Sequence, residues 1–477
     1  MDMHIKKYNK FNYLDKLKTC SRDSRKTLLH MILILLCVLL AVPVFSACGF
    51  LNKTDVLQTL PESTDQQEEE QAGNDSAASE AVEIEIWNKL EPREQIELMN
   101  SIQEFMDNNK NIKIVSRHFR SEEELADQFK AASLAGAGAE LILANISISA
   151  DLAKSKVIRQ IPEEMEYADI ISGLEEISKF ENVNYIIPFR AFDFLLLYYN
   201  RDFVSDVPLN FNDLIQYCRQ VNNPPENMWG FLFNLYEPEW VLPLIGGYQD
   251  WVYDYLTGSI SLDSKAMIST LKMLLTIYND EKILPYGYSY EEINNAFING
   301  NAHMIINGNW AAEDYSNAGI NFGISRIPVV IEGFKNPTPM VDGIGFMFNA
   351  NSYGREFEAA SKLVNYLMTE ETQFSWSLKT KTLPVFNSID SLAQVKENEI
   401  LYSQIQQLKT CRGRINEKAL RVIRDAIKIN LENVMAGNIT PEDAAAKMQE
   451  DAIKLLTGSQ INESPASSEE QPESNES

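Results

Sequence analysis

The sequence predicts an α/β fold in which helices cover a parallel sheet. The first observation is the order of segments near the start of the folded part: alternating residues over 82–87, a helix from Pro92, and further strands over 111–115 and 140–144. Strands that alternate with helices in this way imply a parallel sheet with helical crossovers. The second observation is the apolar run 194–200, which is a further predicted strand.

The individual elements follow from local signals. Pro92 suits the first turn of a helix, and Ile96, Met99, Ile102 and Met106 repeat at three and four residues, which predicts one buried face. Ser121-Glu-Glu-Glu is the capping box of the next helix. The later segments are predicted as strands over 185–188, 228–233, 302–306 and 343–349, and as helices over 212–221, 264–279, 290–298, 357–368, 415–435 and 440–456.

The two ends of the chain differ in composition from the part between them. A basic start, an apolar run over 28–47 and small residues at its end form a secretory signal over 1–47. The same run is also long enough for an uncleaved membrane anchor. Residues 48–81 and 459–477 are acidic and poor in large apolar side chains, so they are predicted to be a disordered spacer and a disordered tail.

Composition narrows the possible partners. The formal charge of −26 repels nucleic acid and anionic lipid. Cys218 and Cys411 are the only cysteines of the predicted folded part, and either a single bridge or two free thiols fits them. The four histidines have no metal-ligand spacing, and no phosphate-binding loop or nucleophile motif is present, so neither metal nor cofactor is expected.

The stretch 297–310 combines several signals. Asn299-Gly300 supplies a helix stop, residues 302–306 alternate as a strand does, and Asn307-Gly308-Asn309 breaks that strand just before Trp310. Ligands of open α/β sheets bind beyond the carboxyl ends of the strands. Trp310 is therefore either a flat platform for a ligand or a core residue that covers a hydrophobic layer, and the residues alone do not decide between these.

The pattern Phe-x-x-Gly-x-Ala-x-Met-x-x-x-Gly-x-Trp over 297–310 resembles the signature of extracellular solute-binding proteins of the maltose-binding type (family 1), the receptors of carbohydrate ABC importers. The resemblance implies a periplasmic-binding-protein-like fold of type II, with two discontinuous α/β lobes around a ligand cleft. Lobe 1 is expected over 82–191 plus 340–386, and lobe 2 over 192–339 plus 387–458. It also implies hinge closure around a solute, no covalent chemistry, and a monomer that docks on permease subunits.

The run Phe-Ser-Ala-Cys48-Gly resembles a bacterial lipobox, in which Cys48 becomes the lipidated first residue of the mature protein. Phe45 stands where Leu is usual in that motif. The resemblance implies a protein anchored by lipid on the extracytoplasmic face of the cell membrane, tethered through the acidic spacer.

The run 234–247, Asn-Leu-Tyr-Glu-Pro-Glu-Trp and onward, also resembles the maltose-binding segment, and this resemblance implies a set of ligand contacts. Glu237 matches a sugar-contacting acid, and Tyr236 and Trp240 would supply aromatic faces unless they only pack the helix. Asp193 falls where a Glu commonly contacts sugar. The expected ligand-binding residues are Trp310, Glu237, Trp240, Tyr236, Asp193, Asn88, Lys89, Asn145 and Asn309.

Some positions depart from the maltose-binding pattern. The run 144–149 offers only Asn145 and two serines, and residues 419–420 are aliphatic where the maltose-binding protein has a stacking Trp, so maltose itself is not expected as the ligand. Arg190 has no counterpart in the family, and we expect it to be a solvated rim charge or to pair with Asp193. Two other functions fit less well: a receptor for a membrane sensor kinase, and a cleft glycosidase that uses Glu237 and Asp193.

Overall fold

The computed structural model describes residues 81–458, except 166, 168, 286 and 333–334. Cys48, the predicted signal, nearly all of the spacer and the predicted tail lie outside the described residues. Within the described ranges, no helix is both long enough and apolar enough to cross a membrane.

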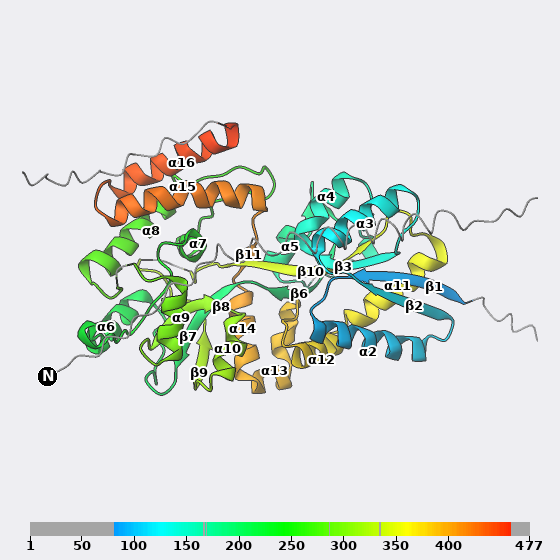
Figure 1. The fold of residues 1–477 in the computed structure, drawn as a ribbon, viewed down its shortest axis with the longest axis horizontal. Helices are drawn as coiled ribbons and strands as arrows, with labels where there is room; N and C mark the ends of the chain where they lie inside the picture. The colour runs from blue at the N-terminus through cyan, green and yellow to red at the C-terminus, as the bar shows by residue number, and fades with distance from the viewer. Residues whose placement is uncertain (1–80, 166, 168, 286, 333–334, 459–477) are drawn as a thin grey trace, which may run out of the picture. The chain divides into compact units, whose positions relative to one another are not determined.

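Six strands form the larger sheet, in the order β11-β10-β3-β1-β2 with β6 also paired to β10 (Figure 1). The strands β1, β2 and β3 are parallel, as predicted, whereas β10 runs antiparallel to both β3 and β6. The bounds are β1 Val82–Asn88, β2 Ile112–His118, β3 Leu141–Asn145, β6 Ile187–Phe192, β10 Met340–Phe348 and β11 Arg412–Gly413. Because β10 and β11 come from late in the chain, this sheet is discontinuous in sequence.

A second sheet has three antiparallel strands, with β7 in the centre between β8 and β9. Their bounds are β7 Leu195–Asn200, β8 Met304–Gly308 and β9 Phe322–Ser325. Every residue of β8 is buried, so the strand is covered on both faces and not only on one. The two residues Asp193 and Phe194 are all that separates β6 of the larger sheet from β7 of the smaller one.

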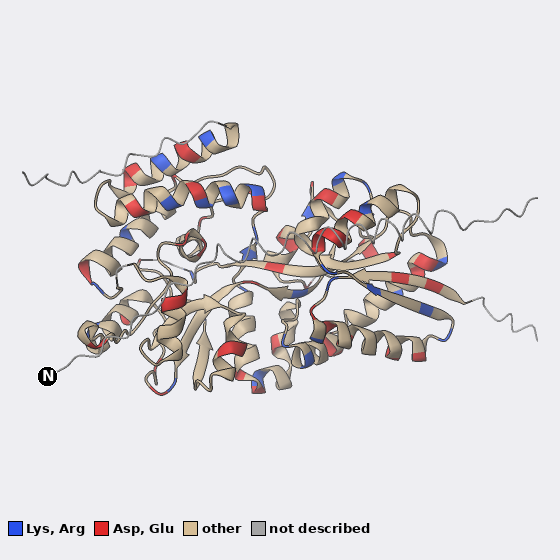
Figure 2. Cartoon of the chain, in the orientation of Figure 1, with Lys and Arg blue, Asp and Glu red and all other residues tan. Residues whose placement is uncertain are grey.

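Helices and a short hairpin, β4 Lys179–Phe180 and β5 Val183–Asn184, complete the fold. The helices are α2 Pro92–Asn108, α3 Glu122–Leu134, α4 Ser149–Lys154, α5 Ser172–Ile177, α6 Phe211–Val221, α7 Pro238–Gly246, α8 Lys265–Leu275, α9 Tyr290–Ile298, α10 Ala311–Asn317, α11 Gly354–Leu367, α12 Glu370–Thr380, α13 Ala393–Glu397, α14 Glu399–Leu408, α15 Glu417–Met435 and α16 Pro441–Thr457. Figure 2 shows that acidic and basic residues are interleaved along α15 and α16.

The buried apolar side chains form two cores, and β7 contributes to both. Leu196 and Tyr198 belong to the core that also contains the larger sheet, whereas Leu195 and Leu197 belong to the core beneath α7, α8 and α15. Successive side chains of a strand point to opposite faces, so one buried strand supplies both layers. Cys218 and Cys411 lie in different cores as free, buried thiols, which excludes the possible bridge.

Three local predictions were wrong in detail. In α2 the side chains of Ile96 and Met99 are 65% and 49% exposed, because the buried stripe runs instead through Leu98, Ile102 and Phe105. The predicted strand over 228–233 is reduced to isolated bridges with the segment 302–305. The strand predicted over 185–188 lies further along, at β6.

Candidate functional site

Trp310 lies two residues after the end of β8 and is the N-cap residue of α10. Its indole ring lies on Gly308, where an added Cβ would come within 2.1 Å of the ring, so the close approach requires glycine. The indole N–H donates to the hydroxyl of Tyr290 at 3.2 Å. The side chain remains 44% exposed. Trp310 is thus held on one face and open on the other, unlike a core tryptophan.

Tyr290 links Trp310 to the second predicted tryptophan. The ring of Trp240, in the first turns of α7, meets the ring of Tyr290 edge-on with centroids 6.0 Å apart. The indole N–H of Trp240 donates to the carbonyl of Ile306 in β8 at 3.4 Å. Tyr236 packs edge-on against Tyr278, with ring centroids 6.4 Å apart.

Charged side chains connect the segment between β6 and β7 to helix α7. Asp193 adopts a φ of 62° between β6 and β7, and its Oδ2 lies 3.3 Å from Nη1 of Arg414. The same Nη1 lies 3.2 Å from Oε2 of Glu239, whose Oε1 accepts from Arg424 at 2.8 Å. We call Asp193, Glu239, Arg414 and Arg424 the Asp193 cluster. Burial raises the pKa of Asp193, and the Arg414 guanidinium opposes that shift. Glu237, the N-cap residue of α7, is half-buried two residues before Glu239.

The three asparagine side chains predicted to bind ligand make different contacts in the fold. Asn88 is fully buried, and its amide donates to Ser116 while its oxygen faces His118. Asn309 binds the backbone of Phe194 through both its N–H and its side-chain oxygen. These contacts occupy them within the fold. The amide nitrogen of Asn145 donates to Asp342 at 3.4 Å.

Lys89 lies directly after β1. Its Nζ lies 2.6 Å from Oε1 of Glu91 in an ion pair. Like Asn145, Lys89 therefore stands just past the carboxyl end of a parallel strand of the larger sheet.

Arg190 does not pair with Asp193, contrary to one of the two predictions for it. Its Nε lies 2.5 Å from Oε1 of Glu94, and the two side chains are 12% and 3% exposed, so it is not a solvated rim charge either. Glu122 and Asp342 are further carboxylates near its guanidinium. We call Glu94, Glu122, Arg190 and Asp342 the Arg190 cluster. Asp342 also interacts electrostatically with Arg414 and Asp193, so the two clusters are contiguous.

The sequence of residues 100–402 matches the family described as bacterial extracellular solute-binding protein. The chain belongs to this family. The fold is that of a type II periplasmic binding protein, because solved maltose-binding proteins share it.

This solute-binding protein is similar to two curated relatives and to one solved structure. The chain is 24% identical over 331 residues to a maltotriose-binding protein of Pyrococcus abyssi, covering 67% of this chain and 70% of that one. It is 22% identical over 275 residues to a galactooligosaccharide-binding protein of Bacillus subtilis, covering 55% and 64%. A maltose/maltodextrin-binding domain of Bdellovibrio bacteriovorus, solved with maltotriose, is 26% identical with a TM-score of 0.56, covering 79% of this chain and all of that one.

A separate ion-pair group connects α10 to two helices of the larger-sheet core. Glu313, in the first turn of α10, lies 3.2 Å from Nη2 of Arg93 in α2 and 3.0 Å from Nζ of Lys381, the C-cap residue of α12. Both lysine and arginine lower the pKa of Glu313. Since α10 begins next to Trp310, these contacts connect the helix that follows Trp310 to α2 and α12.

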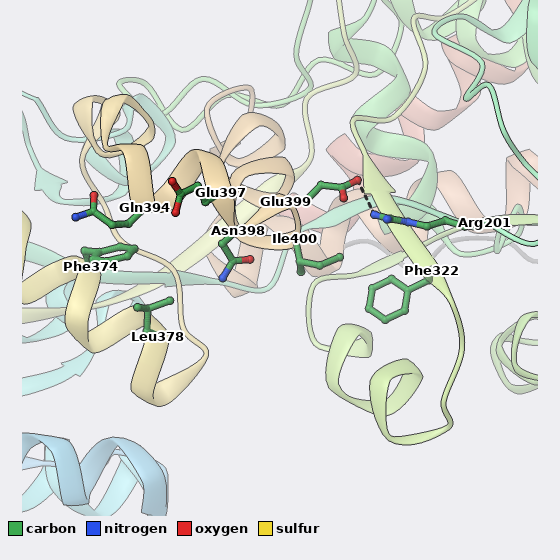
Figure 3. Close-up of a pocket in the computed structure, with 9 residues that line it drawn as sticks. All are labelled: Arg201, Phe322, Phe374, Leu378, Gln394, Glu397, Asn398, Glu399 and Ile400. Atoms are coloured by element: carbon green, nitrogen blue, oxygen red, sulfur yellow. Dashed lines mark hydrogen bonds and ion pairs between the residues drawn. The ribbon is translucent and has the colours of Figure 1, made fainter.

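A cavity of about 610 Å³ lies apart from the predicted ligand contacts (Figure 3). Its lining residues are Arg201, Phe322, Phe374, Leu378, Gln394, Glu397, Asn398, Glu399 and Ile400. Arg201 and Glu399 face each other there in an ion pair of 2.5 Å. It shares no residue with Trp310, Trp240 or Tyr290, or with either charged cluster.

Sequence reasoning missed Glu94, Glu239, Asp342 and Arg414. Glu94 lies in the first turn of a helix, where a carboxylate has a local capping role, so the sequence did not single it out. Arg414 lies 221 residues from its partner Asp193, and no spacing rule connects such a pair. Arg190, which has no counterpart in the family, was the one residue in the sequence that pointed to these partners, because a charge inside an apolar strand needs a partner.

Proposed function

We propose that this protein binds a sugar or oligosaccharide outside the cytoplasm and delivers it to the permease of an ABC importer by hinge closure. The observation that carries the proposal is the combination of an open tryptophan face with carboxylates held by arginines nearby. The names of the curated relatives, which bind maltotriose and galactooligosaccharides, support a carbohydrate ligand. The ligand is expected to be larger than one ring, because those relatives take oligosaccharides.

The chemistry of the site suits a pyranose. The exposed face of Trp310 covers the apolar face of a sugar ring, and Trp240 with Tyr290 extends that surface. Carboxylates accept hydrogen bonds from hydroxyl groups, and Glu237 and Asp193 are the acids assigned to this role. Arg414 holds Asp193 and Glu239 in place, so little side-chain freedom is lost when the ligand binds.

Hinge closure is assigned to the segments that pass between the two sheets. Asp193 and Phe194 connect β6 to β7, and residues 326–339 lead from β9 back to β10. We retain the lobes proposed from the sequence, 82–191 with 340–386 and 192–339 with 387–458. Closure around a ligand would give the permease a distinct state of the receptor to recognise.

A binding protein, and not a glycosidase, is the function we propose. Glycosidases need one carboxyl group protonated as an acid and a second as a base or nucleophile. Asp193, one of the two acids considered for that chemistry, contacts Arg414, whose charge opposes the rise in the pKa of Asp193 that burial causes. A carboxylate already held by an arginine suits hydrogen-bond acceptance by a receptor.

The attachment to the membrane and the oligomeric state complete the proposal. We propose that Cys48 is lipidated and holds a monomer on the extracytoplasmic face, with the acidic residues 49–81 as a spacer. Streptococcal relatives are named as solute-binding lipoproteins, which supports this attachment.

A thermal-shift screen against a carbohydrate library tests the function. A ligand present at about 100 times its Kd raises the free energy of unfolding by about 2.7 kcal/mol. We expect neutral oligosaccharides such as maltotriose or galactooligosaccharides to raise the melting temperature of the full-length protein. Glutamate, spermidine and short peptides serve as non-carbohydrate controls. A screen in which no sugar shifts the transition of a folded protein would contradict the proposal.

A further inference from the structure

Arg190 lies in β6, in register with the carboxyl end of β3 across β10. It pairs with Ile344 of β10 in the sheet register, and Ile344 pairs with Asn145 of β3 on the other side. Directly paired residues on neighbouring strands share a face of the sheet. Asp342, two residues before Ile344 in β10, lies on that same face. The register therefore gathers Asn145, Arg190 and Asp342 on one face.

Two contacts fix the side chain of Arg190, and a third contact holds its partner Glu94. Its Nε lies 2.5 Å from Oε1 of Glu94 in a nearly buried ion pair. Glu94 is itself held, since its Oε2 accepts from the backbone N–H of Glu91 at 3.3 Å. The guanidinium carbon lies 4.8 Å from the ring centre of Phe192. A guanidinium held by a buried acid and an aromatic ring is preorganised to donate hydrogen bonds.

The remaining donors of Arg190 are not used by the fold. Among the residues that the structure describes, the Nη atoms of Arg190 make no hydrogen bond, and Nε is the one nitrogen of the guanidinium that is fully buried without a hydrogen bond, 2.5 Å from Glu94. The Nη atoms therefore keep access to solvent, although the side chain as a whole is only 12% exposed. Donors that reach solvent from a fixed guanidinium are able to bind an acceptor supplied from outside the chain.

Acceptors lie around these donors. Glu122 accepts the backbone N–H of Asn145 through Oε1 at 3.3 Å, while its Oε2 is buried with no hydrogen-bond partner among the described residues. Among the described residues, Oδ2 of Asp342 accepts a single, long hydrogen bond of 3.4 Å from Asn145. Carboxyl oxygens of Glu122 and Asp342 are therefore available beside Arg190.

We propose that Arg190 is a specificity-determining residue of the sugar site, which donates to ligand hydroxyl groups and selects neutral sugars over sugar acids. The inference rests on the function proposed above. A hydroxyl group both donates and accepts, so it satisfies a guanidinium and a neighbouring carboxylate together. A carboxylated sugar accepts from Arg190, but its ionised carboxylate offers no proton to the neighbouring carboxyl oxygens of Glu122 and Asp342, which disfavours it.

Calorimetric titration of the full-length protein with three trisaccharides tests this role. The probes are maltotriose, β-1,4-galactotriose and the acidic trigalacturonate. We expect a neutral trisaccharide to bind and trigalacturonate to bind at least about tenfold more weakly. Arg190→Gln should weaken binding of the neutral sugar about 10- to 100-fold, since a hydrogen bond to a charged group contributes about 1.5–3 kcal/mol and 1.4 kcal/mol is a factor of ten.

Arg159→Gln is the matched control. Arg159 also lies on an aromatic ring, 4.1 Å from the centre of Phe357, and donates to the carbonyl of Ser352, but it belongs to neither cluster. Its substitution should change affinity less than about twofold. Arg190→Lys is the second test variant, because it keeps a cation opposite Glu94 and protects the fold if the glutamine variant unfolds. It lacks the fork and should also lose affinity.

The outcomes separate the two proposals. If no sugar binds the folded wild-type protein, the proposed function fails and the role of Arg190 fails with it. If a neutral sugar binds the wild-type protein and both Arg190 variants equally well, only the role of Arg190 is overturned. Tighter binding of trigalacturonate than of the neutral sugars would also overturn it, because the site would then select an anion.

Discussion

Truncation of Trp310 to alanine separates a ligand platform from a structural tryptophan. Complete burial of a core tryptophan makes its truncation cost about 3–5 kcal/mol of stability. Trp310 is 44% exposed and contacts mainly Gly308 and Tyr290, so we expect its loss to cost about half of that or less. The open face is the part that a sugar ring would cover.

The expected loss of affinity follows from the exposed area. A tryptophan offers up to about 250 Å² of surface, so the open fraction corresponds to about 100 Å². At about 25 cal/mol per Å², covering it contributes up to about 2.5 kcal/mol. We therefore predict that Trp310→Ala raises Kd by about 5- to 60-fold.

Calorimetric titration and chemical unfolding should be measured on the same variant. Trp376→Ala is the matched control, since Trp376 is 2% exposed and packs edge-on against Phe189 in the larger-sheet core. It should lose about 3–5 kcal/mol of stability and keep its affinity per folded molecule. If Trp310→Ala behaves as the Trp376 variant does, the platform is refuted.

Three further predictions concern charge and processing. Burial raises the pKa of Glu122 to about 7, above its ordinary 4.5, so the folded protein retains a proton that the unfolded chain releases, and stability should fall as pH rises between these values. Glu122→Gln should thus be about 1–3 kcal/mol more stable than the wild-type protein in urea unfolding at about pH 8 and nearly equal to it at about pH 5; equal stability at both would contradict the burial argument. Glu313→Gln should weaken sugar binding about two- to fivefold at low ionic strength, because it removes the ion pairs with Arg93 and Lys381. The difference in affinity should vanish in about 0.5 M salt, since salt screens exposed ion pairs. A loss of affinity that does not depend on salt would exclude the ion-pair explanation. Mass spectrometry of protein extracted from membranes should find a lipidated mature start at Cys48, whereas an intact Met1 start would favour the uncleaved anchor.

Local signals predicted the elements near Trp310 well. The Asn299-Gly300 stop occurs as expected, with Gly300 at a φ of 75°, and the strand predicted over 302–306 occurs as β8, shifted by two residues so that it ends at Gly308. Each depends on a few neighbouring residues, so sequence is sufficient. The parallel order of β1, β2 and β3 was predictable for the same reason, because short helical crossovers leave few alternatives.

Side-chain partners were less predictable, because they depend on which distant segments meet. The apolar spacing of α2 suggested a stripe through Ile96 and Met99, yet Glu94 and Glu97 turn inward to pair with Arg190 and Lys379. Two alternative helical faces with similar apolar content differ by a small rotation, and the partners choose between them. Only the register that places β6 beside β10 brings Arg190 to Asp342.

A crystal structure of the protein with the neutral oligosaccharide that gives the largest thermal shift tests the central claim most directly. We predict a sugar ring stacked on the open face of Trp310, with hydroxyl groups within hydrogen-bond distance of Glu237 or Asp193. A sugar bound elsewhere, such as in the cavity beside Arg201 and Glu399, with Trp310 uncovered, would contradict the account.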